Sequence, residues 1–579
     1  MADPLFTIAP ALQRAFAAAT GLPAADIDPV VRPSDRADAQ VNGALALAKQ
    51  VGSNPRQLAE AVLATGVLAE FCEASEVAGP GFINITFSPT FLAEQLAVAA
   101  ADLRLGVRSA TQPQRVVVDY SAPNVAKEMH IGHLRTTVIG DALVRLLMFV
   151  GHTVVRENHI GDWGTPFGML IEHLLDLGET EAADQLSLGD LDAFYKQART
   201  TFDADGAFQD RARSRVVLLQ SGDEETLRLW QLLVDLSNAH FNNAYRKLGV
   251  LLTDDDLAGE STYNPLLPQV IERLRVAGLL QHSDGADVVF PPGYSNREGE
   301  PLPLIVQKRG GGFNYGTSDL ACVIDRIERV GASLLVYVVG APQAQHLSMV
   351  FDVAVMAGWL PRRDQAVHVA FGNVLGPDRK IMKSRSGEPV RFIDVIDDAI
   401  ARATASVATK NPDMPAEEQA DVGRMVGVGA LKYADLSTDR IKDYVFDWDR
   451  MLAFEGNTGP YLQYAHVRIC SIFRRAEVSR QSVRGVITTL AAPEERALAL
   501  QLLQFDTAVQ DTLDRYSPHR LCTYLFDLAQ AFSAFFEACP VLKAPDEATR
   551  LSRLALCDIT ARVLAQGLDL LGIEAPEKM

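Results

Sequence analysis

Residues 115–155 constrain the fold more than any other part of the chain. They open with the β-branched run Val116-Val117-Val118, which is typical of a strand buried on both faces in a parallel sheet. A polar loop follows, and then a helical pattern runs from Leu134 to a stop at Gly151, a residue suited to a helix C-cap. A second strand pattern begins at Val154-Val155. This order predicts an α/β fold with a doubly wound parallel sheet and a ligand at the carboxyl ends of its strands.

The remainder of the chain predicts two further domains. Residues 1–110 combine helical patterns with one short alternating strand, as an α+β domain would. Residues 111–395 would form the α/β domain, with an insertion at about 176–312 that opens with charged helices and ends in hairpin-like sequence. Residues 396–579 predict an all-helical bundle, because strand signals there are few and apolar residues recur at helical spacing.

Composition argues against several classes of protein. No run of about 18 apolar residues is present, so no transmembrane helix is expected, and the N-terminus lacks the pattern of a secretory signal. Six scattered cysteines without a C-x-x-C pair argue against a disulfide framework and a structural zinc site. The cytoplasm is the expected compartment. The net charge of −19 argues against sequence-blind binding to nucleic acid, DNA included, although a specific RNA could dock on local basic patches.

The sharpest motif is His130-Ile131-Gly132-His133, at the turn from the first strand to the helix. A chain of this composition contains an H-x-G-H match by chance only about 0.015 times. The glycine lets a base or ribose approach the backbone. The two imidazoles could donate hydrogen bonds to a phosphoryl transition state beside a helix N-terminus. The alternative is that both histidines only cap the helix.

A second motif is the basic loop Lys380-Ile381-Met382-Lys383-Ser384-Arg385-Ser386-Gly387. Mobile cations beside glycine suit a lid that clamps a triphosphate and neutralises its charge. Taken alone, a charge run of this kind is usually a solvated surface. Its place in the same predicted sheet as the histidine motif favours the lid.

The two motifs together resemble those of class I aminoacyl-tRNA synthetases, in which H-I-G-H is followed by a K-M-S-K-S loop. Longer strings resemble the arginyl-tRNA synthetase family: VDYSAPNVAKEMHIGHLRTTVIGDAL, NHIGDWGTPFGMLI, FNYGTSDLA, LSTDRIKDYVFDWDRMLAFEGNTGPYLQYAHVRI and the ending LLGIEAPEKM. GFINITFS is similar to the extra N-terminal domain of that family. The resemblance therefore covers nearly the whole chain.

The resemblance implies an ATP-dependent ligase for protein synthesis. The carboxylate of L-arginine would attack the α-phosphate of ATP, which enters with Mg²⁺, and diphosphate would leave. The arginyl group would then pass to the 3′-terminal adenosine of tRNA(Arg), initially to its 2′-hydroxyl, and AMP would leave. No covalent enzyme intermediate is implied, so catalysis would consist of positioning and charge stabilisation. The family also implies that adenylate formation needs the tRNA, that residues 396–579 read the anticodon, and that the chain is a monomer.

The resemblance also implies roles for individual residues. The nucleotide site would be formed by His130, Gly132, His133, Met382, Lys383 and Ser384. The arginine pocket would be lined by Asp119, Ala122, Pro123, Asn124, Tyr315, Asp319 and Gln343. An aspartate can pair bidentately with a guanidinium, and a tyrosine ring can stack on it.

Three of these pocket residues have structural alternatives. Asp319 could be a first-turn carboxylate of a helix predicted over residues 320–330, where the helix dipole favours it. Tyr315 could belong to the core, and Gln343 could be a hydrogen bonder at the end of a loop.

The lid departs from the family pattern, because Ser384 stands where the second lysine of K-M-S-K-S belongs. In arginyl enzymes a lysine just upstream of H-I-G-H is thought to substitute, and Lys127 has that place here. Which of Lys127, Lys383 and Arg385 carries the catalytic phosphate contact stays open.

Residues 466–484 are locally basic, with five arginines against one acid, Glu477. Such a helix face is often merely solvated, but it would also suit tRNA phosphates. Tyr461 and Tyr464, just before it, could stack on bases or pack in a core.

Two rival functions stay open: an H-x-G-H nucleotidyltransferase that uses no RNA, and a synthetase-like regulatory protein without activity. The long helical tail disfavours the first, and the intact histidine motif disfavours the second.

Overall fold

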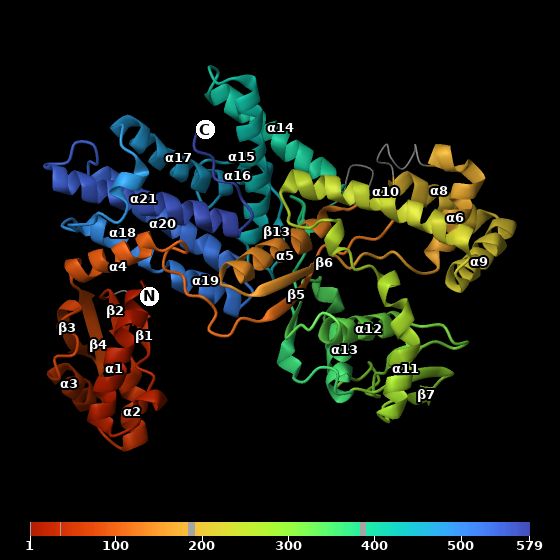
Figure 1. The fold of residues 1–579 in the computed structure, drawn as a ribbon, viewed down its shortest axis with the longest axis horizontal. Helices are drawn as coiled ribbons and strands as arrows, with labels where there is room; N and C mark the ends of the chain where they lie inside the picture. Colours follow the sequence, from red (N-terminus) through yellow and green to blue (C-terminus); the bar gives the residue numbers. More distant parts are fainter. Residues whose placement is uncertain (1, 35, 183–190, 383–389) are drawn as a thin grey trace. The chain divides into compact units, whose positions relative to one another are not determined.

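The predicted strand–loop–helix–strand segment forms an inner strand and an edge strand of a four-stranded parallel sheet (Figure 1). The structure of the chain is a computed structural model that describes residues 2–34, 36–182, 191–382 and 390–579. The strand order is β11-β10-β5-β6, which confirms the predicted parallel α/β fold. Asp119 ends β5 and lies in register with Glu157 of β6 and Tyr337 of β10. These three residues mark the carboxyl edge of the sheet, where a ligand is expected.

The sheet belongs to one of two compact units, formed by Ala110–Ala453 and Leu571–Ile573. The described strands of this unit are β5 (Arg115–Asp119), β6 (Thr153–Glu157), β7 (Gln281–Ser283), β8 (Ala286–Val289), β9 (Leu304–Gln307), β10 (Leu334–Tyr337), β11 (Ala366–His368), β12 (Val374–Leu375) and β13 (Tyr444–Val445). Its described α-helices are α5 (Ile131–Phe149), α6 (Pro166–Leu177), α8 (Leu191–Ala204), α9 (Gly206–Ser221), α10 (Glu224–Leu248), α11 (Leu267–Val276), α12 (Tyr315–Glu328), α13 (Ala344–Met356), α14 (Phe392–Lys410), α15 (Ala416–Leu436) and α16 (Trp448–Met451).

Two helices begin earlier than their apolar spacing predicts. α5 begins at Ile131 rather than Leu134, and α12 begins at Tyr315 rather than Leu320. The first turn of α5 includes Gly132 and His133, and that of α12 includes Gly316 and Thr317; an apolar pattern does not detect such small or polar residues. Gly151 has φ 97° and follows the C-cap Val150, so the predicted stop is confirmed within one residue. The hairpin-like sequence forms the antiparallel pairs β7–β8 and β8–β9.

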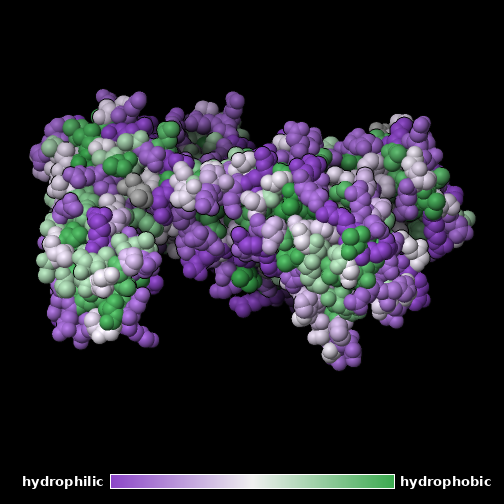
Figure 2. Space-filling model, turned by 60° about the horizontal axis from the view of Figure 1, so that its bottom comes forward, coloured by the Kyte–Doolittle hydropathy of each residue, from purple (hydrophilic) through white to green (hydrophobic). Residues whose placement is uncertain are grey.

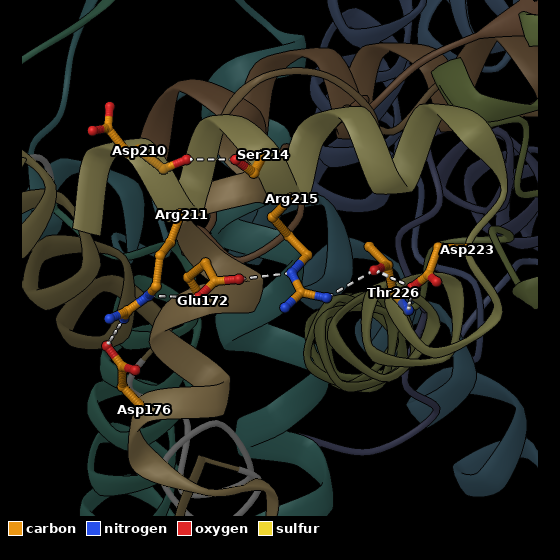
Figure 3. Close-up of polar contacts among 8 residues, drawn as sticks. All are labelled: Glu172, Asp176, Asp210, Arg211, Ser214, Arg215, Asp223 and Thr226. Atoms are coloured by element: carbon orange, nitrogen blue, oxygen red, sulfur yellow. Dashed lines mark hydrogen bonds and ion pairs between the residues drawn. The ribbon is translucent and has the colours of Figure 1, made fainter. Parts of the chain in front are cut away.

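Charged helices do follow β6, and a buried carboxylate links three of them (Figure 3). Glu172 of α6 accepts hydrogen bonds from Arg211 Nε at 3.0 Å and Arg215 Nε at 2.7 Å, both on α9. Arg215 also donates to Thr226 Oγ1 of α10 at 3.0 Å. Gly168 lets α6 approach α9, since a Cβ there would lie 2.2 Å from the carbonyl oxygen of Ala212. The packed helices also fix the loop before α5, because Ser237 Oγ of α10 accepts a hydrogen bond from the Ala126 N–H at 3.0 Å.

α14 and α15 pack along each other and against α5, within the same unit as the sheet. A Cβ on Gly427 of α15 would lie 2.6 Å from the carbonyl oxygen of Ala399 on α14, so this glycine permits the close approach. The unit continues to Ala453.

The other unit is formed by Met1–Ser109, Phe454–Leu570 and Glu574–Met579. Its N-terminal part is an antiparallel sheet of order β1-β2-β4-β3 with helices, as the α+β prediction expects. The described strands are β1 (Val31–Pro33), β2 (Ala39–Val41), β3 (Cys72–Ala78) and β4 (Phe82–Phe87). The described α-helices are α1 (Pro4–Thr20), α2 (Gly43–Val51), α3 (Pro55–Ala64), α4 (Pro89–Ala101), α17 (Gly459–Ala476), α18 (Pro493–Leu503), α19 (Phe505–Asp514), α20 (His519–Ala538) and α21 (Glu547–Leu570).

Among the described helices, none combines the length and the apolar character that a membrane span requires. On the face drawn in Figure 2, hydrophobic side chains form small groups among hydrophilic ones.

Candidate active site

His130 and His133 hold the N-terminus of α5 through their ring nitrogens. His130 is the N-cap residue, and its Nδ1 accepts the backbone N–H of Gly132 at 3.1 Å. His133 Nδ1 accepts the backbone N–H of His130 at 3.1 Å, which resembles the reciprocal bonds of a capping box. A Cβ on Gly132 would lie 2.8 Å from Cε1 of His130, so the glycine also makes room for this ring. Both histidines therefore do cap the helix.

Capping leaves the second nitrogen of each ring available. A peptide N–H can only donate, so in the tautomer in which each Nδ1 accepts one, the neutral ring carries its proton on Nε2. His133 Nδ1 also lies 3.3 Å from the carbonyl oxygen of His130, to which the other tautomer would donate. Burial, and then the neighbouring His130, lowers the pKa of His133 to about 3, and burial lowers the pKa of His130 as well. Both rings are thus neutral near pH 7, and in the tautomer with Nδ1 as acceptor each offers an Nε2–H donor beside the positive end of a helix. Such a pair can hold phosphate oxygens and stabilise charge that develops on them.

The loop between β5 and α5 has a strained backbone. Ser121, Ala122 and Ala126 have φ of 73°, 50° and 57°, a left-handed conformation that residues with a Cβ rarely adopt. Buried hydrogen bonds hold it: Ser121 Oγ lies 2.7 Å from the hydroxyl of Tyr245, and Asn158 Oδ1 accepts the Ala122 N–H at 3.0 Å. Strain that the surroundings hold in place is common at functional sites.

The predicted pocket residues Pro123 and Asn124 lie in this loop. The Pro123 carbonyl accepts the Gly161 N–H at 3.0 Å, and Asn124 forms a parallel bridge with Gly161. A Cβ on Gly161 would lie 2.4 Å from Asn124 Oδ1. Asn124 is exposed and Pro123 is buried. The loop therefore leaves Asn124 exposed, on a backbone that Gly161 allows to pass closely.

The histidine motif pairs through the backbone with the segment that follows the basic motif. Ile131 N–H donates to the carbonyl of Val390 at 2.9 Å, and Phe392 N–H donates to that of Met129 at 2.8 Å. Met382 N–H donates to the carbonyl of Val374 at 3.2 Å. The predicted lid residues Lys383, Ser384 and Arg385 lie outside the described residues, between these two anchored segments. Lys127 has its ammonium 4.5 Å from the ring centre of Tyr195, on α8.

Tyr315 and Asp319, on the first two turns of α12, meet His346 of α13. His346 Nε2 lies 2.5 Å from Asp319 Oδ2, and the rings of His346 and Tyr315 are 4.6 Å apart. Asp319 lies in the second turn of α12, beyond the reach of the dipole argument, so the first-turn alternative is wrong. The core alternative for Tyr315 is also wrong, because its exposed fraction is 64%. Gln343 ends the short turn before α13, is exposed, and makes no side-chain hydrogen bond to any described residue.

Glu260 adds a second carboxylate beside Asp319. Burial, together with the charges of Asp162 and Asp319 and against the opposing charge of His159, raises the pKa of Glu260 to about 7. Two carboxylates that repel each other, with Tyr315 and His346 beside Asp319, suit a compact cation such as a guanidinium. Sequence reasoning missed both Glu260 and His346. Neither residue stands in a motif, and only the packing of α12 against its neighbours brings them together.

Asp119 has a partner within the protein. Its Oδ2 accepts from Arg326 of α12 at 2.7 Å, and Arg326 Nε donates to Glu157 at 2.6 Å. Arg326 is fully buried, with its guanidinium 4.7 Å from the ring centre of Tyr337. One internal cation thus bridges the ends of β5 and β6 and fixes α12, which carries Tyr315 and Asp319.

In the other unit, part of the basic run on α17 has structural partners. Arg468 stacks on Phe536 with 4.2 Å from guanidinium to ring centre, and Arg474 donates to the carbonyl of Glu577 at 3.0 Å. Tyr461 is partly buried against Phe526, whereas Tyr464 is 48% exposed. Sequence spacing alone does not separate these two environments.

Comparison with known proteins identifies the family. Residues 96–448 match the tRNA synthetases class I (R), catalytic domain; residues 462–579 match the DALR anticodon binding domain; and residues 7–87 match the arginyl tRNA synthetase N terminal domain. The chain is 54% identical over 579 residues to an arginine–tRNA ligase of Thermobifida fusca, covering 100% of both chains. It is 48% identical over 564 residues to that of Edwardsiella ictaluri, covering 97% of each.

Solved structures of arginyl-tRNA synthetases have the same fold as this chain. The arginyl-tRNA synthetase of Plasmodium falciparum superposes with a TM-score of 0.83 at 28% identity, covering 99% of both chains. The Thermus thermophilus arginyl-tRNA synthetase superposes with a TM-score of 0.79 at 28% identity, covering 98% of this chain and 99% of the other. The chain belongs to the arginyl-tRNA synthetases, a family of class I aminoacyl-tRNA synthetases.

Proposed function

We propose that this arginine–tRNA ligase joins L-arginine to ATP to form arginyl-adenylate and then transfers the arginyl group to the 3′-terminal adenosine of tRNA(Arg). In the first step a carboxylate oxygen of arginine bonds to the α-phosphorus and the bond to diphosphate breaks. In the second step a ribose hydroxyl attacks the arginyl carbonyl and AMP leaves. ATP enters as its Mg²⁺ complex, and the metal is part of that substrate.

The observation that carries this proposal is the pair of neutral imidazoles capping α5 at the carboxyl edge of the sheet. We assign their Nε2–H donors to the phosphate oxygens of ATP. A neutral donor gains most where negative charge grows, at the five-coordinate phosphorus of the transition state. Gly132 and Met382 would complete the nucleotide site, with Lys127, Lys383, Ser384 and Arg385 supplying cations or a hydroxyl to the diphosphate.

The guanidinium of arginine would bind between Asp319 and Glu260, with the ring of Tyr315 beside it. The repulsion between these carboxylates is relieved when a cation lies between them, and this favours a charged ligand over a neutral one of similar shape. Asn124, Ala122 and Gln343 would contact the rest of the amino acid, near Pro123. Asp119 would reach the substrate through Oδ1, because its Oδ2 is bonded to Arg326.

We further propose that residues 1–110 and the helical C-terminal region grip the tRNA while the sheet domain carries out the chemistry. A boundary near residue 453, later than the one predicted at 395, is supported by the packing of α14 and α15 on α5. The enzyme would act as a monomer in the cytoplasm.

Formation of AMP with arginine, ATP and tRNA(Arg), each omitted in turn, tests this function. We expect AMP only in the complete mixture, and diphosphate exchange only when tRNA is present. Exchange without any tRNA would instead favour a nucleotidyltransferase, and no reaction under any condition would favour an inactive relative.

A further inference from the structure

A cleft of about 860 Å³ lies within the unit that contains α17 and α21. We call it the basic cleft, because three arginines converge in it: Arg480 and Arg484, after α17, and Arg562 of α21. The rest of its lining mixes apolar and polar side chains, including Leu103, Ser479, Gln481, Gln566, Asp569 and Glu577.

The three guanidiniums share one buried carboxylate. Asp558 is 1% exposed, and its Oδ1 accepts from Arg480 Nε at 2.9 Å. Its Oδ2 lies 3.7 Å from Arg484 Nε and 4.0 Å from an Arg562 nitrogen, beyond hydrogen-bond distance. One carboxylate therefore satisfies one arginine and leaves two positive charges beside it only partly compensated.

Arg484 has fewer hydrogen bonds to described residues than Arg480 or Arg562. It is 42% exposed in its side chain and makes no hydrogen bond to any residue that the structure describes. Arg562, in contrast, donates to the carbonyl oxygens of Ala100 at 2.6 Å and Asp102 at 3.3 Å. A planar guanidinium held beside a cleft with free N–H groups is suited to a phosphate.

An exposed apolar side chain lies at the same cleft. Leu103 is 91% exposed, although large apolar side chains rarely face water so fully. An unstacked nucleotide has the matching pair of groups, a charged phosphate and an apolar base face. The carboxylates of Asp569 and Glu577 in the lining would repel further phosphates, so the cleft suits a single one.

We propose that the basic cleft binds one phosphodiester of the tRNA through Arg484, with Arg562 and Arg480 behind it, and that the adjoining base packs on Leu103. This rests on the proposed function, and it locates the contact away from Arg468 and Arg474, which have structural partners. The cleft would hold the RNA by its backbone and by one splayed base.

The test is tRNA binding by the full-length enzyme as a function of salt. Arg484→Gln should weaken binding about three- to tenfold at about 0.1 M salt. It should also lower the slope of log K against log salt by roughly 0.7–0.9, the loss of one phosphate contact. Arg484→Lys should keep most of the slope. Leu103→Ser should weaken binding without changing the slope, because it removes no charge.

Arg362→Gln is the matched control, since Arg362 is an exposed arginine outside the cleft and should leave both quantities unchanged. If Arg484→Gln binds with the normal affinity and slope, the proposal is overturned. Charging of tRNA by the unaltered enzyme tests the proposed function separately, so either idea can fail without the other.

Discussion

His130 and His133 stand three residues apart on one helix end, whereas Asp319, His346 and Glu260 come from three elements spread over residues 260–346. The first group is a local structure: backbone N–H groups hold both rings. The second exists only once α12 and α13 have packed and Arg326 has been buried. Substitutions at the first should therefore change the rate of the chemistry, and substitutions at the second should change the affinity for arginine.

The largest expected effect is at His133. His133→Ala should lower kcat by about 10²–10³, the usual loss of one donor used in the transition state, with little change in the KM for ATP. Steady-state aminoacylation and diphosphate exchange measure both quantities.

The matched control is His133→Gln, whose side-chain oxygen can still accept the His130 N–H and cap α5. We expect a normal melting temperature and a low kcat. If His133→Gln has both a normal melting temperature and a normal kcat, His133 acts only by capping the helix.

On the other side of the site, Asp319→Asn should raise the KM for arginine at least tenfold and leave the KM for ATP nearly unchanged. Loss of one partner of a desolvated charge pair costs roughly 2–5 kcal/mol, and the bond to His346 is weakened as well. His346→Asn should have a smaller effect of the same kind. If arginine binds Asp319→Asn normally, the guanidinium lies elsewhere.

Glu260 predicts a pH dependence confined to arginine binding. Its pKa is raised to about 7, so the carboxyl becomes protonated as the pH falls through 7 and no longer attracts the guanidinium. The KM for arginine should rise roughly tenfold from pH 8 to pH 6, and Glu260→Gln should show a high KM at both. Because the folded protein holds this proton more tightly than the unfolded chain, Glu260 should also make the ligand-free enzyme less stable as the pH rises from about 4.5 to 7. A KM that is flat across this range in the unaltered enzyme contradicts the assignment.

The smallest expected effect is at Tyr315. Tyr315→Ala should raise the KM for arginine about two- to fivefold, as the loss of a partly exposed cation–π contact costs about 0.5–1 kcal/mol. Tyr315→Phe keeps the ring and should change the KM less. Equal losses in the two variants would indicate that the hydroxyl, rather than the ring, meets the substrate.

Sequence patterns predicted the local parts of this molecule well. The buried run of valines, the histidine motif and the glycine after α5 each act within a few residues of chain, and each was found in its predicted element. The first turns of α5 and α12 were missed because residues such as His133 and Thr317 are polar, and an apolar pattern does not detect polar residues.

Residues that act through long-range contacts were harder to predict. Arg326 is a charged residue in a helical pattern, where exposure is the usual expectation, yet it is fully buried between Asp119 and Glu157. Nothing in the sequence around Glu260 marks it as unusual. Its pKa is raised by burial and by the charges of residues that are distant in the chain. Such properties depend on the packed tertiary structure, which spacing along the chain does not report.

The buried Arg326 has a consequence for the accuracy of translation. Lysine at this position would offer one ammonium in place of the planar fork that bonds Asp119 and Glu157 together. A ribosome that misreads this codon would therefore make a synthetase whose sheet ends and α12 are no longer tied to each other. An enzyme that attaches arginine to tRNA thus has an arginine bonded inside its own catalytic unit, at a position where lysine would not make the same pair of bonds.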